Sequence, residues 1–215
     1  YFMKKLFILT FLLATICLCP LASGAVPIID MPVEWNGQRE VLTREYSQKH
    51  YGMDITKIVP QAVVIHWTAS KTWKSAYNYF YSPARADGTL NVASQFIVDR
   101  DGTIYRLMDE TSLARHAIGY NWCAIGIENV GGVNNVEDLT QEQLASNVEL
   151  IRYLHNKYPS IQYVFGHYQQ IAARKSGLYI EHVEGYHSVK SDPGPSFMTG
   201  LHSNLSKDGL TFFPE

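Results

Sequence analysis

Short apolar runs rich in β-branched residues recur through the middle of the chain, and each has the length of a strand. The runs cover residues 61–66, 92–100, 103–108, 123–130 and 162–166. Asp101-Gly102 separates the second run from the third and is typical of a two-residue turn, so we expect these two strands to pair antiparallel. The nearly continuous apolar character of residues 123–130 favours a central strand.

Apolar residues at helical spacing predict three helices, over residues 71–81, 140–158 and 197–205. In the second of these, Thr140 and Gln143 have the spacing of a capping box, in which the two residues cap each other's backbone N–H groups. Apolar residues then recur every three or four positions as far as Tyr158-Pro159, where the proline ends the pattern.

Strands interleaved with helices predict an α/β fold: a single domain with a central mixed β-sheet and helices packed on it. We place this domain at residues 61–215. Residues 25–60 have few periodic stretches and several turn-forming residues. They predict an N-terminal arm lying over the domain, to which we assign no chemistry.

The first residues have the pattern of a secretory signal peptide. Met3-Lys4-Lys5 gives a short basic start, and residues 6–21 form an almost uninterrupted apolar run. Ala22-Ser23-Gly24 supplies small residues of the kind that signal peptidase reads, so we place the cut after Gly24. A membrane anchor is the alternative, but a run of about 16 residues is short for a span that needs roughly 20. We therefore expect residues 1–24 to be removed and the mature protein to be periplasmic or extracellular, without stable membrane insertion.

Composition and charge narrow the function further. The 215-residue chain is 46% hydrophobic and 18% charged, which is ordinary for a folded domain. Its formal charge is −2, or about −4 once Lys4 and Lys5 are removed, and it contains no basic run. Nucleic acid is therefore not expected as a partner. Cys123 is the single cysteine after the signal, so the core must be stable without an internal disulfide.

Three places combine metal-ligand residue types with a strand end or a rigid turn. His66 and His167 each end an apolar run, and Asp192 lies in the proline-bounded turn of residues 190–195. Two imidazoles and one carboxylate are a common protein ligand set for a catalytic Zn²⁺. Taken singly, each residue also fits a structural role, as a hydrogen-bonded strand-end histidine or a turn aspartate.

Six motifs, in order, make the chain similar to the type 2 family of N-acetylmuramoyl-L-alanine amidases. This family includes the cytoplasmic anhydro-muropeptide amidases, phage T7 lysozyme and the peptidoglycan recognition proteins. The motifs are VVIHWTAS around His66, SQFIVDRDGTIYRLMDE from Ser94, ARHAIGYN from Ala114, AIGIENVGG from Ala124, VFGH ending at His167, and KSDPGPSF from Lys190. They run from about residue 61 to residue 197, which is nearly the whole expected mature domain.

The resemblance implies a role for particular residues. His66, His167 and Asp192 would bind zinc, where T7 lysozyme and the recognition proteins have a cysteine in place of Asp192. Glu128, in the Gly-Ile-Glu motif, would be the general base, a role favoured here because Ser94-Gln95-Phe96 lacks the catalytic tyrosine of T7 lysozyme. Lys190 would stabilise the transition state.

Two further residues are expected at the substrate. His116 and Asn121 lie in the ARHAIGYN motif, and we expect them to shape the cleft and contact the substrate without binding the metal.

One segment departs from the family pattern. Residues 168–189 form a longer connection than in the compact relatives, and His187 within it is an alternative to His167 as the second ligand. We prefer His167, because a strand end orients a ligand better than a long loop. We interpret the insertion as a wall of the substrate cleft, where Tyr168, Tyr179 and Tyr186 are candidates for stacking on sugar or peptide.

The resemblance implies hydrolysis of the amide between N-acetylmuramic acid and L-alanine in peptidoglycan or muropeptides, with Zn²⁺ as cofactor. A peptidoglycan-recognition module without catalysis is the alternative from another class. A zinc hydrolase of a different peptide bond is a third possibility.

Overall fold

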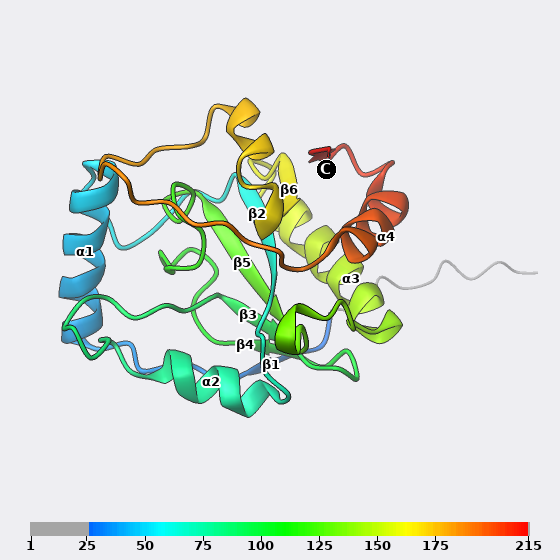
Figure 1. Cartoon of the computed structure of the whole chain (residues 1–215), viewed down its shortest axis with the longest axis horizontal. Helices are drawn as coiled ribbons and strands as arrows, with labels where there is room; N and C mark the ends of the chain where they lie inside the picture. The colour runs from blue at the N-terminus through cyan, green and yellow to red at the C-terminus, as the bar shows by residue number, and fades with distance from the viewer. Residues whose placement is uncertain (1–25, 215) are drawn as a thin grey trace, which may run out of the picture.

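The computed structural model describes residues 26–214, which form one seven-stranded mixed sheet with four α-helices (Figure 1). The strands are β1 (Ile28–Asp30), β2 (Ala62–Trp67), β3 (Phe96–Val98), β4 (Ile104–Arg106), β5 (Ala124–Asn129), β6 (Tyr163–Gly166) and β7 (Thr211–Phe212). The helices are α1 (Gly37–Tyr51), α2 (Trp73–Tyr81), α3 (Gln141–Lys157) and α4 (Pro195–Leu205). The expected signal peptide lies outside the described residues. Within them, no helix has the length and apolar character needed to cross a membrane.

The strands lie in the order β1-β4-β3-β5-β2-β6-β7. The predicted hairpin is confirmed, because β3 and β4 pair antiparallel. The remaining neighbours pair parallel, and β5 occupies the middle of the sheet, as the apolar run predicted. The predicted α/β fold with a mixed sheet is therefore confirmed.

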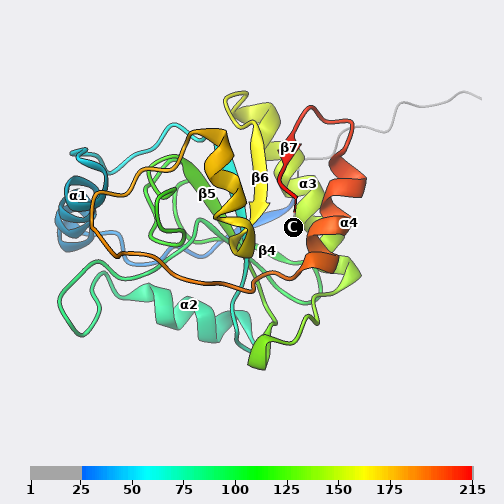
Figure 2. The same cartoon turned by 45° about the horizontal axis from the view of Figure 1, so that its top comes forward.

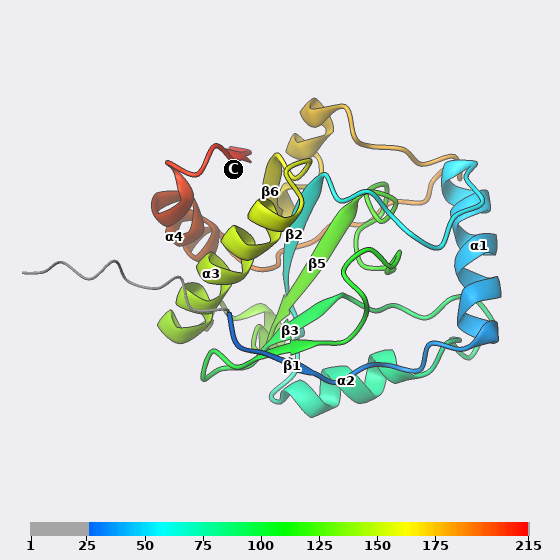
Figure 3. The same cartoon turned by 180° about the vertical axis from the view of Figure 1, so that it is seen from behind.

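Alternating residues of the central strands face two separate cores. Val63 and Ile65 of β2 pack with Ile151 and Leu154 of α3, which Figure 3 shows beside β2 and β6. Val64, between them, belongs to a different cluster, formed largely by loops that follow β4 and β6. This two-residue period is the strand geometry that the apolar runs predicted, with burial on both faces.

The predicted helices are present as α2, α3 and α4. Thr140 and Gln143 make both hydrogen bonds of the predicted capping box at the start of α3. α4 begins with Pro195, a residue well suited to the first turn of a helix because it has no N–H to leave unpaired.

The expected N-terminal arm contains β1 and a 15-residue helix that the apolar pattern does not indicate. The buried residues of α1 are mostly polar, so hydrophobic periodicity is missing: Arg39, Thr43, Tyr46, Ser47, His50 and Tyr51. Arg39 is 1% exposed and donates to the carbonyl oxygens of Phe80 and Ser82, each at 2.9 Å. Its guanidinium thereby fastens α1 to the end of α2 by hydrogen bonds, in place of an apolar stripe.

Candidate active site

The carboxyl ends of three neighbouring parallel strands bring the candidate residues together. His66 on β2 lies opposite Glu128 on β5, and His167 directly follows the last residue of β6. Parallel strands end at the same edge of a sheet, which is where ligands bind in open α/β folds. Asp192 comes from a later turn, and its carbonyl accepts a hydrogen bond of 2.9 Å from the N–H of Tyr168.

The side chains of His66, His167 and Asp192 converge on one point. Nδ1 of His66 lies 3.0 Å from Nδ1 of His167 and 3.1 Å from Oδ2 of Asp192. Nδ1 of His167 lies 3.2 Å from the same oxygen. The three residues are 2%, 5% and 7% exposed. Within residues 26–214, they are the only group of three or more histidine, cysteine or acidic residues whose ligand atoms lie close enough to share an ion.

The protonation states of this cluster fit a metal site. Burial above all, with the neighbouring His66, lowers the pKa of His167 to about 4, so its ring is neutral near pH 7. Burial alone would raise the pKa of Asp192, but its hydrogen bonds to His167 and His66 hold this pKa below its ordinary value. A neutral ring and a carboxylate offer lone pairs to a shared point. This is the arrangement of three protein ligands that suits a catalytic Zn²⁺.

The structure brings His167, and not His187, to this cluster. His187 is exposed on the segment that we call the strap, residues 177–191. Figures 1 and 2 show this segment, in orange, running from the short helix after β6 across to α1 and back to the start of α4.

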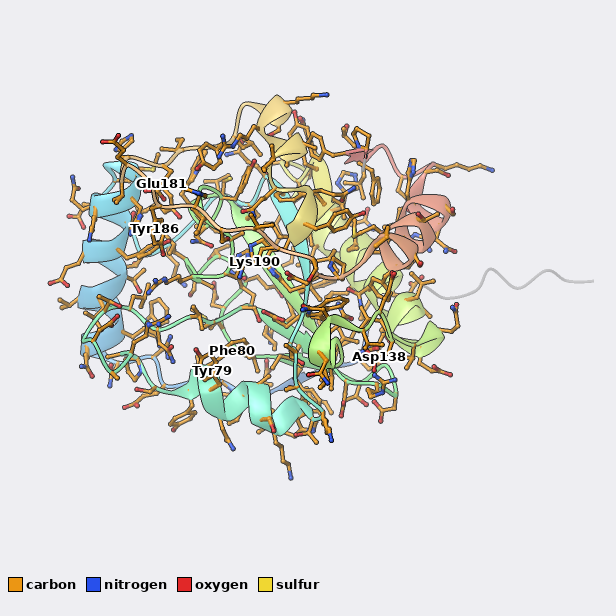
Figure 4. The ribbon with its side chains drawn as sticks, viewed as in Figure 1. Tyr79, Phe80, Asp138, Glu181, Tyr186 and Lys190 are labelled. Atoms are coloured by element: carbon orange, nitrogen blue, oxygen red, sulfur yellow. The ribbon has the colours of Figure 1, made fainter. Side chains whose placement is uncertain are left out.

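A cleft of about 810 Å³ opens over the cluster. Tyr79 and Phe80 of α2 line it, and so do Val189 and Lys190 of the strap. In Figure 4, Lys190 lies on the segment above α2, where Tyr79 and Phe80 are labelled. Tyr79 is 61% exposed and was not among the residues expected at the site. The sequence could have indicated Tyr79 in one way, because it is an aromatic residue that stands outside the positions forming the buried face of the helix.

Glu128 lines the same cleft and carries an unpaired carboxylate oxygen. Its Oε2 is buried and has no hydrogen-bond partner among the described residues. Burial is the main cause that raises the pKa of Glu128 well above its ordinary value of 4.5. The negative charge of Asp192 raises it further, and Lys190 opposes the shift. A carboxyl with a raised pKa can both take and return a proton near neutral pH.

His116 and Asn121 have different positions in the site. His116 lines the cleft, and its Nδ1 lies 3.1 Å from Nε2 of His66. Asn121 is fully buried, and its side-chain oxygen accepts hydrogen bonds from the backbone N–H groups of His116 at 2.9 Å and Ala117 at 2.6 Å. The structure thus shows Asn121 supporting the loop that carries His116. Direct contact of either residue with substrate stays a prediction.

The insertion of residues 168–189 contains two short 3-10 helices, η2 (His167–Gln169, which begins one residue earlier) and η3 (Ala172–Ser176), followed by most of the strap. Glu181 anchors the strap to α1 through a 2.9 Å contact with Nδ1 of His50. Tyr186 accepts a 2.9 Å hydrogen bond from Arg115.

The tyrosines of the insertion do not have the placement expected for stacking in the main cleft. The residues that line the 810 Å³ cleft include neither Tyr168, Tyr179 nor Tyr186. The Tyr179 ring instead lies under the guanidinium of Arg174, 4.1 Å from it. Tyr186 instead lines a smaller pocket that shares His116, His167 and Lys190 with the main cleft. From the strap, Val189, Lys190 and Ser191 line the main cleft. Stacking of the tyrosines on substrate stays a prediction.

The chain matches the family described as N-acetylmuramoyl-L-alanine amidase over residues 56–195. The endolysin of Enterobacteria phage T3 is 33% identical over 76 residues, which are 35% of this chain and 50% of that protein. The endolysin of Escherichia phage T7 is 33% identical over 75 residues, 34% of this chain and 50% of that protein. The chain thus spans about half the length of the curated relatives it matches.

Solved structures resemble the fold over most of the chain. N-acetylmuramoyl-L-alanine amidase LysC from Clostridium intestinale URNW aligns with a TM-score of 0.53 and 22% identity, covering 86% of this chain and 99% of that one. Drosophila PGRP-LB aligns with a TM-score of 0.53 and 16% identity, covering 86% and 96%. At these identities the likeness concerns the fold.

Proposed function

The chain belongs to the N-acetylmuramoyl-L-alanine amidase family, and from this premise we propose that it is a zinc-dependent hydrolase. Its proposed target is the amide bond between N-acetylmuramic acid and L-alanine, in peptidoglycan or in muropeptides. The observation that carries the proposal is the convergence of His66, His167 and Asp192 beneath an 810 Å³ cleft that also contains Glu128 and Lys190.

We propose that His66, His167 and Asp192 hold the zinc ion. Burial favours this role, because it keeps the His167 ring neutral and shields the cluster from bulk water. When bound, Zn²⁺ supplies Lewis acidity, which makes water a better nucleophile and an amide carbonyl a better electrophile.

Glu128 is proposed as the general base. It stands on β5 directly opposite His66 on β2, at the edge of the sheet where the cluster lies. Its unpaired Oε2 can accept the proton of the attacking water and then deliver it to the departing amine nitrogen. The raised pKa of Glu128 suits both steps, because it makes the carboxylate a stronger base toward the attacking water and brings its proton affinity closer to what return of the proton to the amine requires.

Lys190 is proposed to stabilise the charge that develops on the carbonyl oxygen. It is exposed at the end of the strap, in the cleft wall, and stands two residues before Asp192. An ammonium group placed there offsets negative charge in the tetrahedral transition state, a contribution whose loss typically costs about 10²–10³ in rate.

We also propose that the protein is exported, with residues 1–24 as a cleaved signal peptide. Peptidoglycan lies outside the cytoplasmic membrane, so export would bring the enzyme to its substrate. Amino-terminal sequencing of the secreted protein tests this, and Ala25 is the first residue expected. Retention of the apolar run in the exported protein would contradict it.

The decisive experiment is digestion of purified muropeptides by the mature protein, with and without a chelator, followed by mass spectrometry. We expect free stem peptide and free muramic-acid product, both abolished by the chelator and restored by Zn²⁺. Tight muropeptide binding without cleavage would replace the proposal with recognition alone. Cleavage at another peptide bond would identify a different zinc hydrolase.

A further inference from the structure

A chain of hydrogen bonds leads from the proposed metal ligands to the backbone of the central strand. Nε2 of His66 lies 3.1 Å from Nδ1 of His116, and Nε2 of His116 lies 3.2 Å from the carbonyl oxygen of Ala124 on β5. The other nitrogen of His66, Nδ1, faces His167 and Asp192. His66 is therefore held on both sides of its ring.

The carbonyl at the end of this chain determines where the protons lie. A carbonyl oxygen only accepts, so Nε2 of His116 must carry a proton. The other nitrogen of the His116 ring, Nδ1, faces Nε2 of His66. A histidine that offers the lone pair of its Nδ1 to a metal carries its ring proton on Nε2. Nε2 of His66 then donates to Nδ1 of His116, and Nδ1 of His66 points its lone pair at the place that His167 and Asp192 also face.

The loop and the strand around His116 are built to hold its ring in this position. A Cβ atom at Gly126 would lie 2.8 Å from Cγ and 2.9 Å from Nδ1 of the His116 ring, so a glycine is needed for the ring to rest against β5. On the other side, the side-chain oxygen of Asn121 accepts hydrogen bonds from the backbone N–H groups of His116 and Ala117. Asn121 is itself held, since its side-chain amide donates to the hydroxyl of Tyr46 at 3.1 Å.

We propose that His116 is a positioning residue that fixes the tautomer and ring plane of His66 for metal binding. The proposal rests on the zinc site of the proposed function. In this role the His116 side chain acts on His66, and it does not need to contact the substrate. It also explains the glycine of the Gly-Ile-Glu motif, which makes room for this ring. Groups that orient a metal-bound histidine typically contribute about 10–100-fold in metal affinity.

Three variants test the proposal. His116→Leu removes the acceptor and leaves the Nε2–H of His66 unpaired. His116→Asn places a carbonyl oxygen near the position of Nδ1 and should rescue the contact. Gly126→Ala displaces the ring without removing a polar group. His155→Leu is the matched control, because the one hydrogen bond of the His155 side chain within residues 26–214 is to the carbonyl oxygen of Ile161, away from the site.

The first readout is zinc affinity from competition with a chromophoric chelator. We expect His116→Leu and Gly126→Ala to bind zinc roughly 10–100-fold more weakly than wild type, with His116→Asn within a few-fold of wild type and the His155 control unchanged. The second readout is ¹⁵N NMR of the His66 ring in the metal-free protein. Wild type should show the Nε2–H tautomer, and folded His116→Leu should show a mixture.

The outcomes separate this inference from the function on which it rests. Zinc affinity and a His66 tautomer unchanged in both His116→Leu and Gly126→Ala overturn the positioning role while leaving the zinc site intact. If His116→Leu does not fold, Gly126→Ala decides alone by the same criteria. Wild-type protein that binds no zinc overturns the proposed function itself, and the tautomer measurement then still reports on the hydrogen-bond chain.

Discussion

Replacing Glu128 with glutamine should make the protein more stable and nearly inactive at once. In the folded state, burial raises the pKa of Glu128, so the folded protein keeps its proton to higher pH than the unfolded chain does. The stability of the wild type must then fall as pH rises above 4.5, the ordinary value for this carboxyl, until the folded-state group has also ionised. Glutamine cannot ionise, so the variant escapes this loss.

The expected size follows from the higher proton affinity of Glu128 in the folded state. Each tenfold rise in the proton affinity of this carboxyl on folding costs the ionised wild type about 1.4 kcal/mol. Each kcal/mol moves the Tm of a domain this size by about 2–4 °C, so the variant should gain roughly 3–6 °C near pH 8 for each such tenfold rise. At about pH 4 the gain should vanish, because the wild-type carboxyl is then protonated in both states. Loss of the general base should meanwhile lower kcat by about 10²–10⁴.

The assay is thermal unfolding of chelator-treated wild type and Glu128→Gln between about pH 4 and pH 8, with stem-peptide release measured on the zinc-loaded proteins. Glu45→Gln, at an exposed position of α1, is the matched control and should leave both quantities unchanged. Parallel Tm profiles for the wild type and Glu128→Gln would refute the reasoning about burial. Full activity in Glu128→Gln would refute its role as base.

Three further predictions concern separate parts of the molecule. His167→Ala should abolish stoichiometric zinc binding, whereas His187→Ala should leave one zinc per chain; metal analysis showing the reverse would transfer the ligand role to His187. Lys190→Ala should lower kcat about 10²–10³-fold with zinc content unchanged, and a rise in KM alone would indicate a binding role instead. Glu110→Gln should destabilise the protein by about 1–3 kcal/mol at pH 7, measured by urea unfolding. The Glu110 carboxylate is 3% exposed, accepts hydrogen bonds from two tyrosine hydroxyls and pairs with Lys157 at 2.7 Å. Burial alone would raise the pKa of Glu110, but these partners lower it, so the difference should shrink as pH falls below 4.5, and a difference that stays constant would contradict this account.

The sequence was informative where apolar pattern and local chemistry agree. The runs around His66, Glu128 and His167 became parallel strands, so three residues far apart in sequence were placed at one edge of the sheet. The capping box of Thr140 and Gln143 is likewise local, since it depends on three residues of spacing and not on the rest of the fold.

Structure that rests on buried polar contacts could not be predicted in this way. α1 buries Arg39 and His50 instead of an apolar stripe, and its place is set by carbonyl oxygens of α2 and by Glu181 of the strap. The partnership of His116 with His66 joins residues 50 positions apart and has no periodic signature. Local spacing carries no information about either contact, because both partners are brought together by tertiary packing.

Local sequence pattern could not decide either whether His167 or His187 lies beside Asp192. Both lie within reach of Asp192 along the chain, and only the path of the strap separates them. Its anchoring on α1 carries His187 to an exposed position, while the end of β6 holds His167 beside Asp192.

Zinc dependence of the amidase activity is tested most directly by titrating metal-stripped protein with Zn²⁺ and following release of stem peptide from muropeptides by mass spectrometry. We expect no release from the stripped protein, a linear rise in rate with added zinc, and a plateau at one equivalent per chain. Release that persists after stripping, or no release at any zinc concentration, would contradict the proposed function.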